Sequence, residues 1–268
     1  MVQLAGSPER ISRADFDEVV ELVHQRAGIV LTSAKEELVM ARLSKRLRAT
    51  GIGSFAAYMD LVRKERSELA EMIDVLTTNK TAFFREPAHF DFLREQLVPQ
   101  WEASGESVAI WSAACSTGEE PYSVAMEIAA ASRTVAARTR ILATDLSARA
   151  LERARSATYR PDMVGQFPGD RLRFLEKRER EYRILPMIRS MVKFARLNLL
   201  DAWPMRGPFS LILCRNVMIY FDKPTQYGLA RRFGQLLGDG GMLFIGHSES
   251  LGSADVGLNY VQPAVYAR

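Results

Sequence analysis

The sequence contains little cysteine and no long apolar segment, and both absences narrow the class of protein. Cys115 and Cys214 are the only cysteines among 268 residues, too few to staple the fold, so we expect a reducing, cytoplasmic environment. The longest apolar runs, such as residues 208–214, fall far short of the roughly 20 residues that cross a membrane. The first residues lack an apolar core behind a basic start, which argues against a secretory signal. We therefore predict a cytoplasmic globular protein that does not insert into membranes.

A strong excess of either charge is also absent from the chain as a whole. The chain carries 36 basic and 32 acidic residues, a net charge of +4. The excess is local, because residues 146–196 hold 13 Lys or Arg against six Asp or Glu, whereas residues 1–78 hold 11 against 12. A basic region of this kind suits nucleic acid, an acidic protein partner or a solvated surface. Composition leaves these three interpretations open.

The first 76 residues show only helical patterns. Apolar residues recur every three or four positions over residues 16–23. Ser33 and Glu36 have the spacing of a capping box, which predicts a helix that begins there and ends near Gly51. Two more short amphipathic helices follow. We therefore predict an all-α N-terminal domain over residues 1–76.

From residue 77 the pattern changes to strands that alternate with helices. This alternation predicts an α/β domain over residues 77–268 with a mostly parallel, doubly wound sheet, because crossover helices join parallel strands. Between residues 159 and 196 the rhythm breaks, which predicts a small inserted antiparallel β-subdomain. The predicted main strands are residues 107–113, 140–144, 209–214 and 241–246, with helices over 148–156 and 225–237. The predicted inserted strands are residues 171–175, 182–185 and 192–195.

Polar residues follow three of the predicted parallel strands, at the edge where a doubly wound sheet binds its ligands. A loop of small residues, 113–121, links the first strand to a helix but lacks the G-x-G-x-x-G pattern. Asp145 ends the second strand, where an acidic group suits ribose hydroxyls and where a helix cap is the alternative. Arg215 and Asn216 directly follow a later strand, and Tyr220 lies one turn further on.

Six motifs in a fixed order make the chain resemble a known family. They are T-T-N-K-T-A-F-F-R-E from residue 77, W-S-A-A-C-S-T-G-E-E-P-Y-S from residue 111, A-T-D from residue 143, N-L-L from residue 198, C-R-N-V-M-I-Y-F from residue 214 and G-H-S-E-S from residue 246. Together they resemble the CheR-type chemoreceptor glutamate O-methyltransferases, from about residue 16 to residue 266. The resemblance implies a Rossmann-like S-adenosylmethionine methyltransferase domain behind an all-α domain. It also implies methyl transfer from S-adenosylmethionine to glutamate side chains on the cytoplasmic helical bundle of chemoreceptors in chemotaxis adaptation, with S-adenosylhomocysteine as the product.

The resemblance also implies roles for individual residues. Asp145 is expected to bind the cofactor's ribose, and Asn198 and Leu199 to flank its adenine. Arg85 and Tyr220 are expected nearest the reacting carboxylate, although Tyr220 also fits a core aromatic with a solvated hydroxyl. No catalytic base is needed, because a glutamate with a pKa of about 4.3 is already ionised at pH 7. The other cofactor contacts implied by the motifs are Asn79, Thr81, Arg85, Glu120, Arg215 and Asn216.

Two features of the sequence concern receptor recognition. Arg42, Lys45 and Arg46 recur at helical spacing and form a basic stripe that suits a glutamate-rich helix, with a solvated face as the alternative. Some members of the family bind a receptor's C-terminal pentapeptide by strand addition to the β-subdomain, and those members share a glycine in its hairpin turn. Here the turn, residues 176–181, reads E-K-R-E-R-E, shorter and without glycine. We therefore predict methylation that is independent of such a pentapeptide.

The three histidines are far apart in the sequence and show no metal-ligand spacing. They are His24, His89 and His247, and His247 is interpreted as structural. We therefore predict no metal site. Separately, we expect the protein to be a monomer.

Two rival functions are weighed against the methyltransferase. The basic balance suits an RNA-binding protein or RNA methyltransferase, but an aromatic-rich RNA platform is missing, so no nucleic-acid partner is expected. A receptor-binding adaptor that has lost catalysis is the other rival. The presence of Asp145, Arg85, Arg215 and Asn216 argues against that adaptor.

Overall fold

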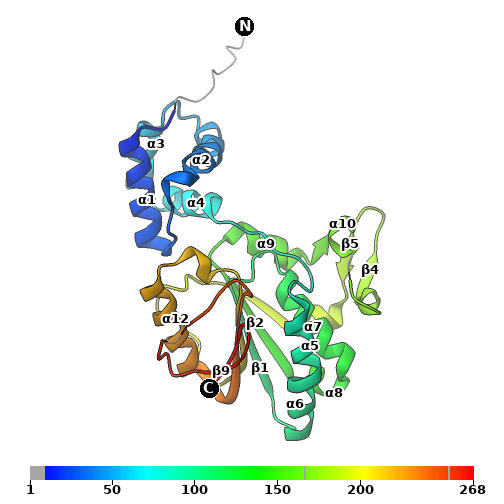
Figure 1. Ribbon diagram of the computed structural model, residues 1–268. Helices are drawn as coiled ribbons and strands as arrows, with labels where there is room; N and C mark the ends of the chain where they lie inside the picture. Colours follow the sequence, from blue (N-terminus) through cyan, green and yellow to red (C-terminus); the bar gives the residue numbers. More distant parts are fainter. Residues whose placement is uncertain (1–9, 166, 253) are drawn as a thin grey trace. The chain divides into compact units, whose positions relative to one another are not determined.

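The computed structural model describes residues 10–165, 167–252 and 254–268. These residues form two compact units, which divide between Thr78 and Asn79 (Figure 1). The described part of the first unit contains helices and no strand, and every described strand belongs to the second unit. Within the described ranges, no helix is both long enough and apolar enough to cross a membrane.

The N-terminal unit is built from amphipathic helices around a small apolar core. Gly51 ends the second helix with a φ of 72°, the left-handed conformation that glycine adopts without a Cβ clash, as the sequence predicts. The helical elements are α1 (Arg13–Ala27), the 3-10 turn η1 (Ser33–Lys35), α2 (Glu36–Thr50), α3 (Phe55–Lys64) and α4 (Arg66–Leu76). The core side chains, each at most 2% exposed, include Val19, Val23, Leu43, Leu47, Tyr58 and Met72.

The capping box predicted at the start of α2 is wrong. Ser33 does not cap the helix but begins the 3-10 turn η1, and α2 itself begins at Glu36. The Glu36 N–H donates to the Ser33 carbonyl, and the residue at the N-cap, Lys35, makes no side-chain cap hydrogen bond. The tighter turn therefore takes over the backbone bonding that the capping box was expected to supply.

The second unit is organised by a seven-stranded sheet in the order β6-β2-β1-β7-β8-β10-β9. The first five strands in this order are parallel, and β10 and β9 complete the sheet in antiparallel pairs. The predicted doubly wound, mostly parallel sheet is therefore confirmed. The strands are β1 (Val108–Ala113), β2 (Thr139–Asp145), β6 (Val192–Arg196), β7 (Phe209–Cys214), β8 (Leu237–Ile245), β9 (Asn259–Gln262) and β10 (Val265–Ala267).

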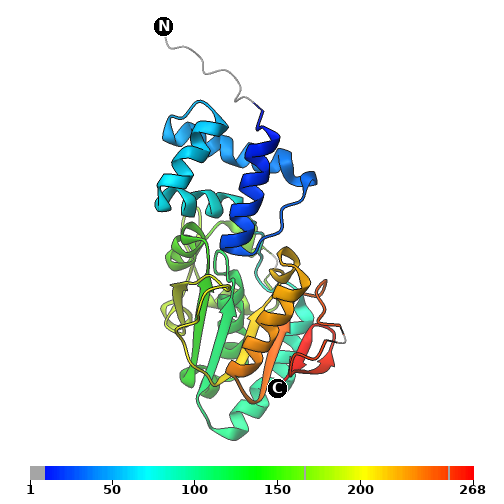
Figure 2. The same ribbon diagram turned by 90° about the vertical axis from the view of Figure 1, so that its left-hand side faces the viewer.

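Helices cover both faces of this sheet. Figures 1 and 2 show α7 (Glu119–Ala131) on one face and α12 (Lys223–Leu236) on the other. The chain passes outward from β1 to β2 and β6 and then returns to β7 on the other side of β1. The direction of winding therefore reverses between β1 and β7, which is where such sheets bind ligands. The remaining helical elements are α5 (Pro87–Phe92), the π-helical η2 (Leu93–Leu97), α6 (Val98–Ser104), α8 (Arg133–Arg138), α9 (Ala148–Ser156), α10 (Pro161–Val164), η3 (Arg171–Phe174), α11 (Pro186–Arg189) and η4 (Met218–Tyr220).

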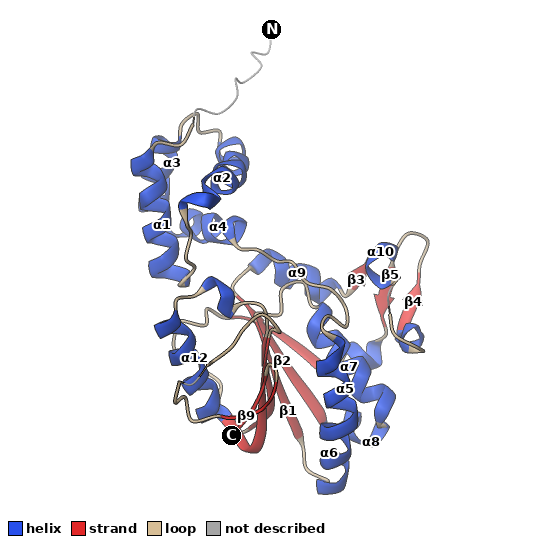
Figure 3. Cartoon of the chain, viewed as in Figure 1, coloured by secondary structure: helices blue, strands red, loops and turns tan. Residues whose placement is uncertain are grey.

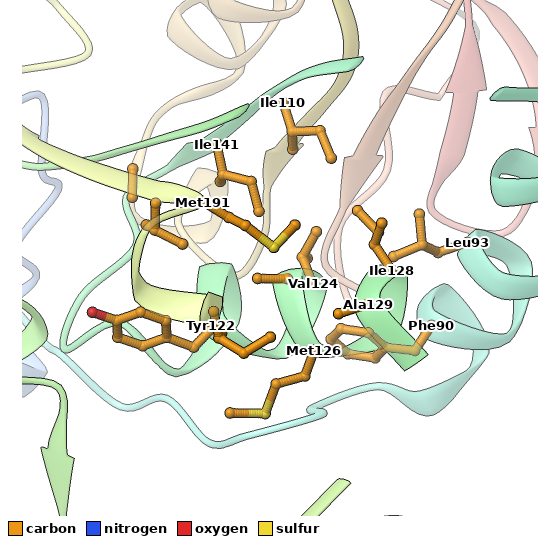
Figure 4. Packing of buried hydrophobic residues seen from close by; sticks show 14 of the residues in the cluster. Phe90, Leu93, Ile110, Tyr122, Val124, Met126, Ile128, Ala129, Ile141 and Met191 are labelled. Carbon is orange, nitrogen blue, oxygen red and sulfur yellow. The ribbon is translucent and has the colours of Figure 1, made fainter. Parts of the chain in front are cut away.

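Side chains along β1 point alternately to the two faces of the sheet, and each face packs in a hydrophobic core of its own. Ile110 belongs to the buried cluster that packs strands against α7, where Figure 4 shows it with Val124 and Ile128. The next residue, Trp111, contacts Phe233 of α12 and Trp203, with ring centroids 5.2 and 4.8 Å apart. Both strand faces are thus buried, as a parallel sheet requires.

A small three-stranded antiparallel sheet stands apart from the main sheet (Figure 3). It consists of β3 (Thr158–Tyr159), β5 (Tyr182–Ile184) and β4 (Leu175–Lys177), in that order. The inserted antiparallel β-subdomain is confirmed, but two of its predicted strands are wrong. Residues 171–174 form the 3-10 turn η3, and residues 192–195 belong to β6.

The reason for the β6 error lies in how that strand pairs. β6 lies parallel to β2 over five residue pairs, from Ile141 with Val192 to Asp145 with Arg196. Its alternating sequence, V-K-F-A-R, suits an edge strand with one buried face just as well as a solvated hairpin. Sequence pattern alone does not separate these two cases.

A buried carboxylate connects the insertion to the main domain. Glu127 of α7 is 1% exposed, and its oxygens accept from Arg171 Nη2 at 2.8 Å and Arg171 Nε at 3.1 Å. Arg94 Nη1 donates to the same carboxylate at 3.2 Å. The bidentate arginine holds the segment before β4 against α7, which orients the insertion.

Candidate active site

Strained backbone gathers at the carboxyl ends of β1 and β7. Among the described residues, seven that are not glycine have a positive φ. Such residues cost about 1–3 kcal/mol each and persist where the surroundings enforce them, often at functional sites. Five of the seven lie in the segments next to these two strand ends: Phe84, Glu86, Ala114, Ser116 and Asn216.

Asp145 lies at the carboxyl end of β2 and anchors the loop that follows β1. Its Oδ2 accepts from the Ser116 N–H at 2.8 Å, and its Oδ1 accepts from the Ser147 N–H at 2.8 Å. The helix cap of α9 is Ser147, whose hydroxyl accepts from the Ala150 N–H. The alternative in which Asp145 is itself that cap is therefore wrong. The two backbone donors fix the direction of the Asp145 carboxylate at the ligand edge of the sheet.

Arg215 is the centre of a buried ion-pair network between β1 and β7. Its Nη1 donates to Glu120 Oε2 at 3.1 Å, and its Nη2 donates to Glu86 Oε2 at 3.0 Å and to the Arg85 carbonyl. Glu120 also accepts from the Ser112 hydroxyl at 2.7 Å. Burial raises the pKa of Glu120, and Arg215 opposes that rise. The guanidinium therefore joins three segments that are far apart in the sequence.

Glu86 is a member of this site that sequence reasoning missed. Besides Arg215, its carboxylate accepts from Asn216 Nδ2 at 3.0 Å and from the His247 N–H at 3.2 Å. Burial on its own raises the pKa of Glu86, but the Asn216 hydrogen bond and the Arg215 charge outweigh it and lower the pKa to about 2. Glu86 is therefore an anion that holds Arg215 and Asn216 in place.

A second carboxyl group, Glu249, braces the turn after β7. Its Oε2 accepts from the Asn216 N–H at 3.0 Å and its Oε1 from the Ile219 N–H at 3.1 Å. Gly246 is required beside it, because a Cβ there would lie 2.8 Å from the Asn216 nitrogen and 2.9 Å from Glu249 Oε2. These contacts explain why the C-R-N and G-H-S-E-S motifs occur together.

His89 and His247, which are far apart in the sequence, lie side by side in the fold. Their ring centroids are 4.8 Å apart, and His89 Nδ1 is 3.6 Å from Glu86 Oε2. His89 stacks on Phe244 with ring centroids 4.8 Å apart. Burial, then Arg215 and His247, lower the pKa of His89 to about 3 despite opposing effects of Glu86 and the Ala264 carbonyl. The fold brings together what the sequence separates.

Arg85, Asn79, Thr81 and Tyr220 lie on the segments that flank this network. Arg85 is half-buried and its Nη1 donates to the Lys80 carbonyl at 3.0 Å. Asn79 is exposed, and its carbonyl accepts from the Ser116 hydroxyl at 3.4 Å. Thr81 and Tyr220 are both half-buried, and Tyr220 ends the short turn η4.

Asn198 and Leu199 follow the carboxyl end of β6. Asn198 Oδ1 accepts from the Leu200 N–H at 3.1 Å, which makes a tight polar turn. Leu199 is buried, and its carbonyl accepts from Arg232 Nη1 at 2.8 Å and Trp203 Nε1 at 3.1 Å. Of the predicted site residues, those that end or follow strands β2, β6 and β7 are Asp145, Asn198, Leu199, Arg215 and Asn216. The hydrogen bond from Arg215 to Glu120, in the helix after β1, links the ends of β7 and β1.

The basic stripe of the N-terminal unit is not uniform. Arg42 Nη1 donates to the Leu76 and Thr77 carbonyls at 2.7 and 2.9 Å, at the end of α4. Arg46 pairs with Glu68 at 2.6 Å and with Glu71. Lys45 is exposed. Docking of a receptor on the whole stripe stays a prediction. Two of its three cations, Arg42 and Arg46, already make hydrogen bonds or ion pairs within the unit.

Replacing Arg46 with methionine is expected to destabilise the N-terminal unit by roughly 3 kcal/mol, because the buried Glu68 carboxylate then loses its cation and keeps only the Tyr58 hydroxyl. Lys45→Met removes the same charge from an exposed position and is expected to change stability by less than about 0.5 kcal/mol. Hydrogen exchange of peptides from α2 and α4 measures both. Equal exchange rates in the two variants would contradict this role of Arg46.

The stabilisation that the Arg46–Glu68 ion pair gives the N-terminal unit is also expected to depend on pH. Burial raises the pKa of Glu68, but the hydrogen bonds from Arg46 and Tyr58 outweigh it and hold that pKa below its ordinary value. The unfolded chain, with an ordinary pKa of about 4.3, therefore binds the proton more readily. The stabilisation is fully present above the unfolded pKa of about 4.3. It is lost as pH falls through the lower pKa that Glu68 has in the folded protein. The Arg46→Met variant and the wild type should thus converge in urea midpoint on acidification.

The fold and site together define a doubly wound α/β domain that binds a nucleoside-containing ligand. The supporting features are the switch point between β1 and β7 and the acidic residue at the end of the neighbouring strand. The chain matches the family of the CheR methyltransferase SAM-binding domain over residues 79–265. It matches the CheR methyltransferase all-alpha domain over residues 14–77.

Relatives of similar length carry the same assignment. The chemotaxis protein methyltransferase of Escherichia coli (strain K12) is 40% identical over 265 residues, covering 96% of this chain and 91% of its own. Chemotaxis protein methyltransferase 2 of Pseudomonas aeruginosa is 39% identical and covers 96% and 93%, and the Borreliella burgdorferi chemotaxis protein methyltransferase is 35% identical and covers 96% and 95%. The chain belongs to the CheR methyltransferase family and is an S-adenosylmethionine-dependent methyltransferase, which confirms the resemblance carried by its motifs.

Proposed function

We propose that the chain transfers a methyl group from S-adenosylmethionine to glutamate side chains on the cytoplasmic helical bundle of chemoreceptors. The observation that carries this proposal is the buried network of Arg215 with Glu86 and Glu120, which shares with Asp145 the edge of the sheet where the parallel strands end. The reaction then takes place in the cytoplasm, with the chain acting as a monomer in chemotaxis adaptation.

The residues at this edge suit the parts of the cofactor. Asp145 is the ribose ligand, and Asn198 and Leu199 flank the adenine. The Nε of Arg215 is buried and has no hydrogen-bond partner among the described residues, so the site keeps one donor for an acceptor on a ligand. The other proposed contacts are Asn79, Thr81, Arg85, Glu120 and Asn216.

The proposed reaction requires alignment of the glutamate carboxylate with the methyl donor rather than a catalytic base. When bound, S-adenosylmethionine would supply an electrophilic methyl group on its sulfonium, which an ionised glutamate could accept without a base, with S-adenosylhomocysteine as the leaving group. Arg85 and Tyr220 orient that glutamate, each through a directional hydrogen bond that leaves an oxygen lone pair for attack. Exclusion of water favours the step, because opposite charges neutralise each other in the transition state. Strong pairing of the carboxylate with Arg85 would weaken the nucleophile.

Recognition of the receptor is proposed to be independent of its C-terminal pentapeptide. The β4–β5 turn is tight, with the Arg178 N–H donating to the Glu181 carbonyl at 2.8 Å, and it contains no glycine. Exposed Lys45 and its neighbours on α2 offer acidic methylation helices a charged surface instead. The hairpin sequence thus supports receptor docking on α2 rather than on the β-subdomain.

Methylation rates of a receptor cytoplasmic fragment, with and without its last five residues, test this recognition mode. We expect kcat/KM to agree within about twofold, because no tethering energy is lost. Lys45→Glu is expected to lower kcat/KM for the intact fragment and leave S-adenosylhomocysteine affinity unchanged. A drop of tenfold or more on removal of the five residues would show tethering.

A further inference from the structure

Glu86, His89 and His247 form a cluster of side chains of the types that bind metals, and the two histidines have no part in the proposed methyl transfer. One ligand atom from each lies within 4.8 Å of the other two. Both ring nitrogens of His89 are buried and make no hydrogen bond of normal geometry among the described residues, although the Ala264 carbonyl lies near enough to act on the ring. A buried imidazole in that condition usually has a partner such as a water or an ion. His247, by contrast, is exposed.

We propose that these three side chains bind one divalent transition-metal ion of the Zn²⁺ class. Two imidazoles and one carboxylate are a donor set that Zn²⁺ takes at about 2.0–2.2 Å, with water as a further ligand. The ligand atoms must move closer together than they lie now. His247 is the ligand placed to supply that movement, because its ring is exposed and already contacts His89, and its exposure gives the ion a route from solvent.

Acidic and basic groups both lie beside the cluster. Three carboxyl groups, those of Glu86, Glu120 and Glu249, share one hydrogen-bonded network with a single guanidinium, that of Arg215. A divalent ion at the histidines adds positive charge next to this acidic set. Glu86 Oε2, already 3.6 Å from His89 Nδ1, is the oxygen that reaches the ion.

Binding of the ion opposes binding of the cofactor. The oxygen that ligates the ion is the one that accepts from Arg215 Nη2, and its partner oxygen accepts from Asn216 Nδ2. Recruitment of Glu86 loosens both side chains, which the proposed function places in the cofactor site. This consequence rests on that function, whereas ion binding itself does not.

Calorimetric titration of the tag-free chain with Zn²⁺, and with Co²⁺ followed by visible absorption, tests the site. The background is small, because the chain has three histidines and both of its cysteines are buried. One ion per chain is expected, with the Co²⁺ absorption of a low-coordinate site. His247→Gln is expected to weaken binding at least about tenfold. His89→Phe, which keeps an aromatic ring on Phe244, should do the same, and the exposed control His24→Gln should leave affinity unchanged.

Two results would overturn the proposal. Zn²⁺ affinity that is equal in the wild type, His247→Gln and His89→Phe would show that the cluster binds no metal. S-adenosylhomocysteine affinity that is the same with and without saturating Zn²⁺ would show that the ion does not oppose the cofactor. A chain that binds Zn²⁺ as described but never binds S-adenosylhomocysteine would contradict the proposed cofactor site and the antagonism, and leave the metal site standing.

Discussion

Arg215→Met is expected to unfold at a lower temperature than the wild type and to lose S-adenosylhomocysteine binding. The substitution leaves Glu86 and Glu120 buried without their common cation, and loss of one partner of a buried ion pair costs about 3–5 kcal/mol. For a unit of this size that corresponds to a fall in Tm of roughly 10 °C. Thermal unfolding by circular dichroism and calorimetric titration measure the two effects.

Two further variants separate charge from geometry at this position. Arg215→Lys keeps the positive charge but not the forked contacts to two carboxylates and a carbonyl, so we expect an intermediate Tm and weak binding. Arg149→Met makes the same chemical change at an exposed arginine of the same unit and should resemble the wild type. If Arg215→Met matched Arg149→Met in both measurements, the network would have no structural role.

Asp145→Ala is expected to weaken S-adenosylhomocysteine binding by about 10- to 150-fold while the unit stays folded. The substitution removes the carboxylate proposed to hold the ribose, and a single hydrogen bond to a charged group contributes about 1.5–3 kcal/mol. It also releases the Ser116 and Ser147 N–H groups, so the loop after β1 loses its anchor. Calorimetric titration measures the affinity, and circular dichroism verifies the fold.

Asp145→Asn distinguishes the two contributions of this residue. The amide keeps one carbonyl oxygen for a backbone N–H but lacks the charge, so we expect affinity between those of the alanine variant and the wild type. Asp162→Ala, at an exposed acidic residue, is the matched control and should bind normally. Wild-type affinity in Asp145→Ala would remove Asp145 from the cofactor site.

The central strands and their polar ends were predictable from the sequence because local pattern determines them. The apolar runs that become β1, β2 and β7 are flanked by turn residues, and the rule for doubly wound sheets then places Asp145 and Arg215 at the ligand edge. Asn216 follows from the same rule. For these residues, position along a strand was enough.

Glu86 was not predictable in the same way. Its partner Arg215 is 129 residues away, and no spacing within the segment 77–86 indicates a carboxylate that accepts three hydrogen bonds. The pairing of His89 with His247 is hidden for the same reason. Interactions of this kind depend on which loops the sheet order brings together, and that order was not determined by the pattern of any single segment.

The β-subdomain shows a different limit. Residues 192–196 have an alternating pattern that fits either an inserted hairpin or the edge of the main sheet, and only the parallel pairing with β2 decides between them. The capping box at Ser33 failed because a 3-10 turn offered the backbone an equivalent set of bonds. Both errors concern competition between local structures of similar energy.

Methyl transfer to a receptor fragment, followed by treatment with alkali, tests the proposed reaction in a single assay. The chain is incubated with methyl-labelled S-adenosylmethionine and the cytoplasmic fragment of a chemoreceptor. A glutamyl methyl ester is cleaved by base, so we expect the label to be released as methanol, and to be strongly reduced when Asp145→Ala replaces the wild type at low S-adenosylmethionine concentration. Label that resists alkali, or no label on the fragment with a wild-type chain that binds S-adenosylhomocysteine, would contradict glutamate O-methylation.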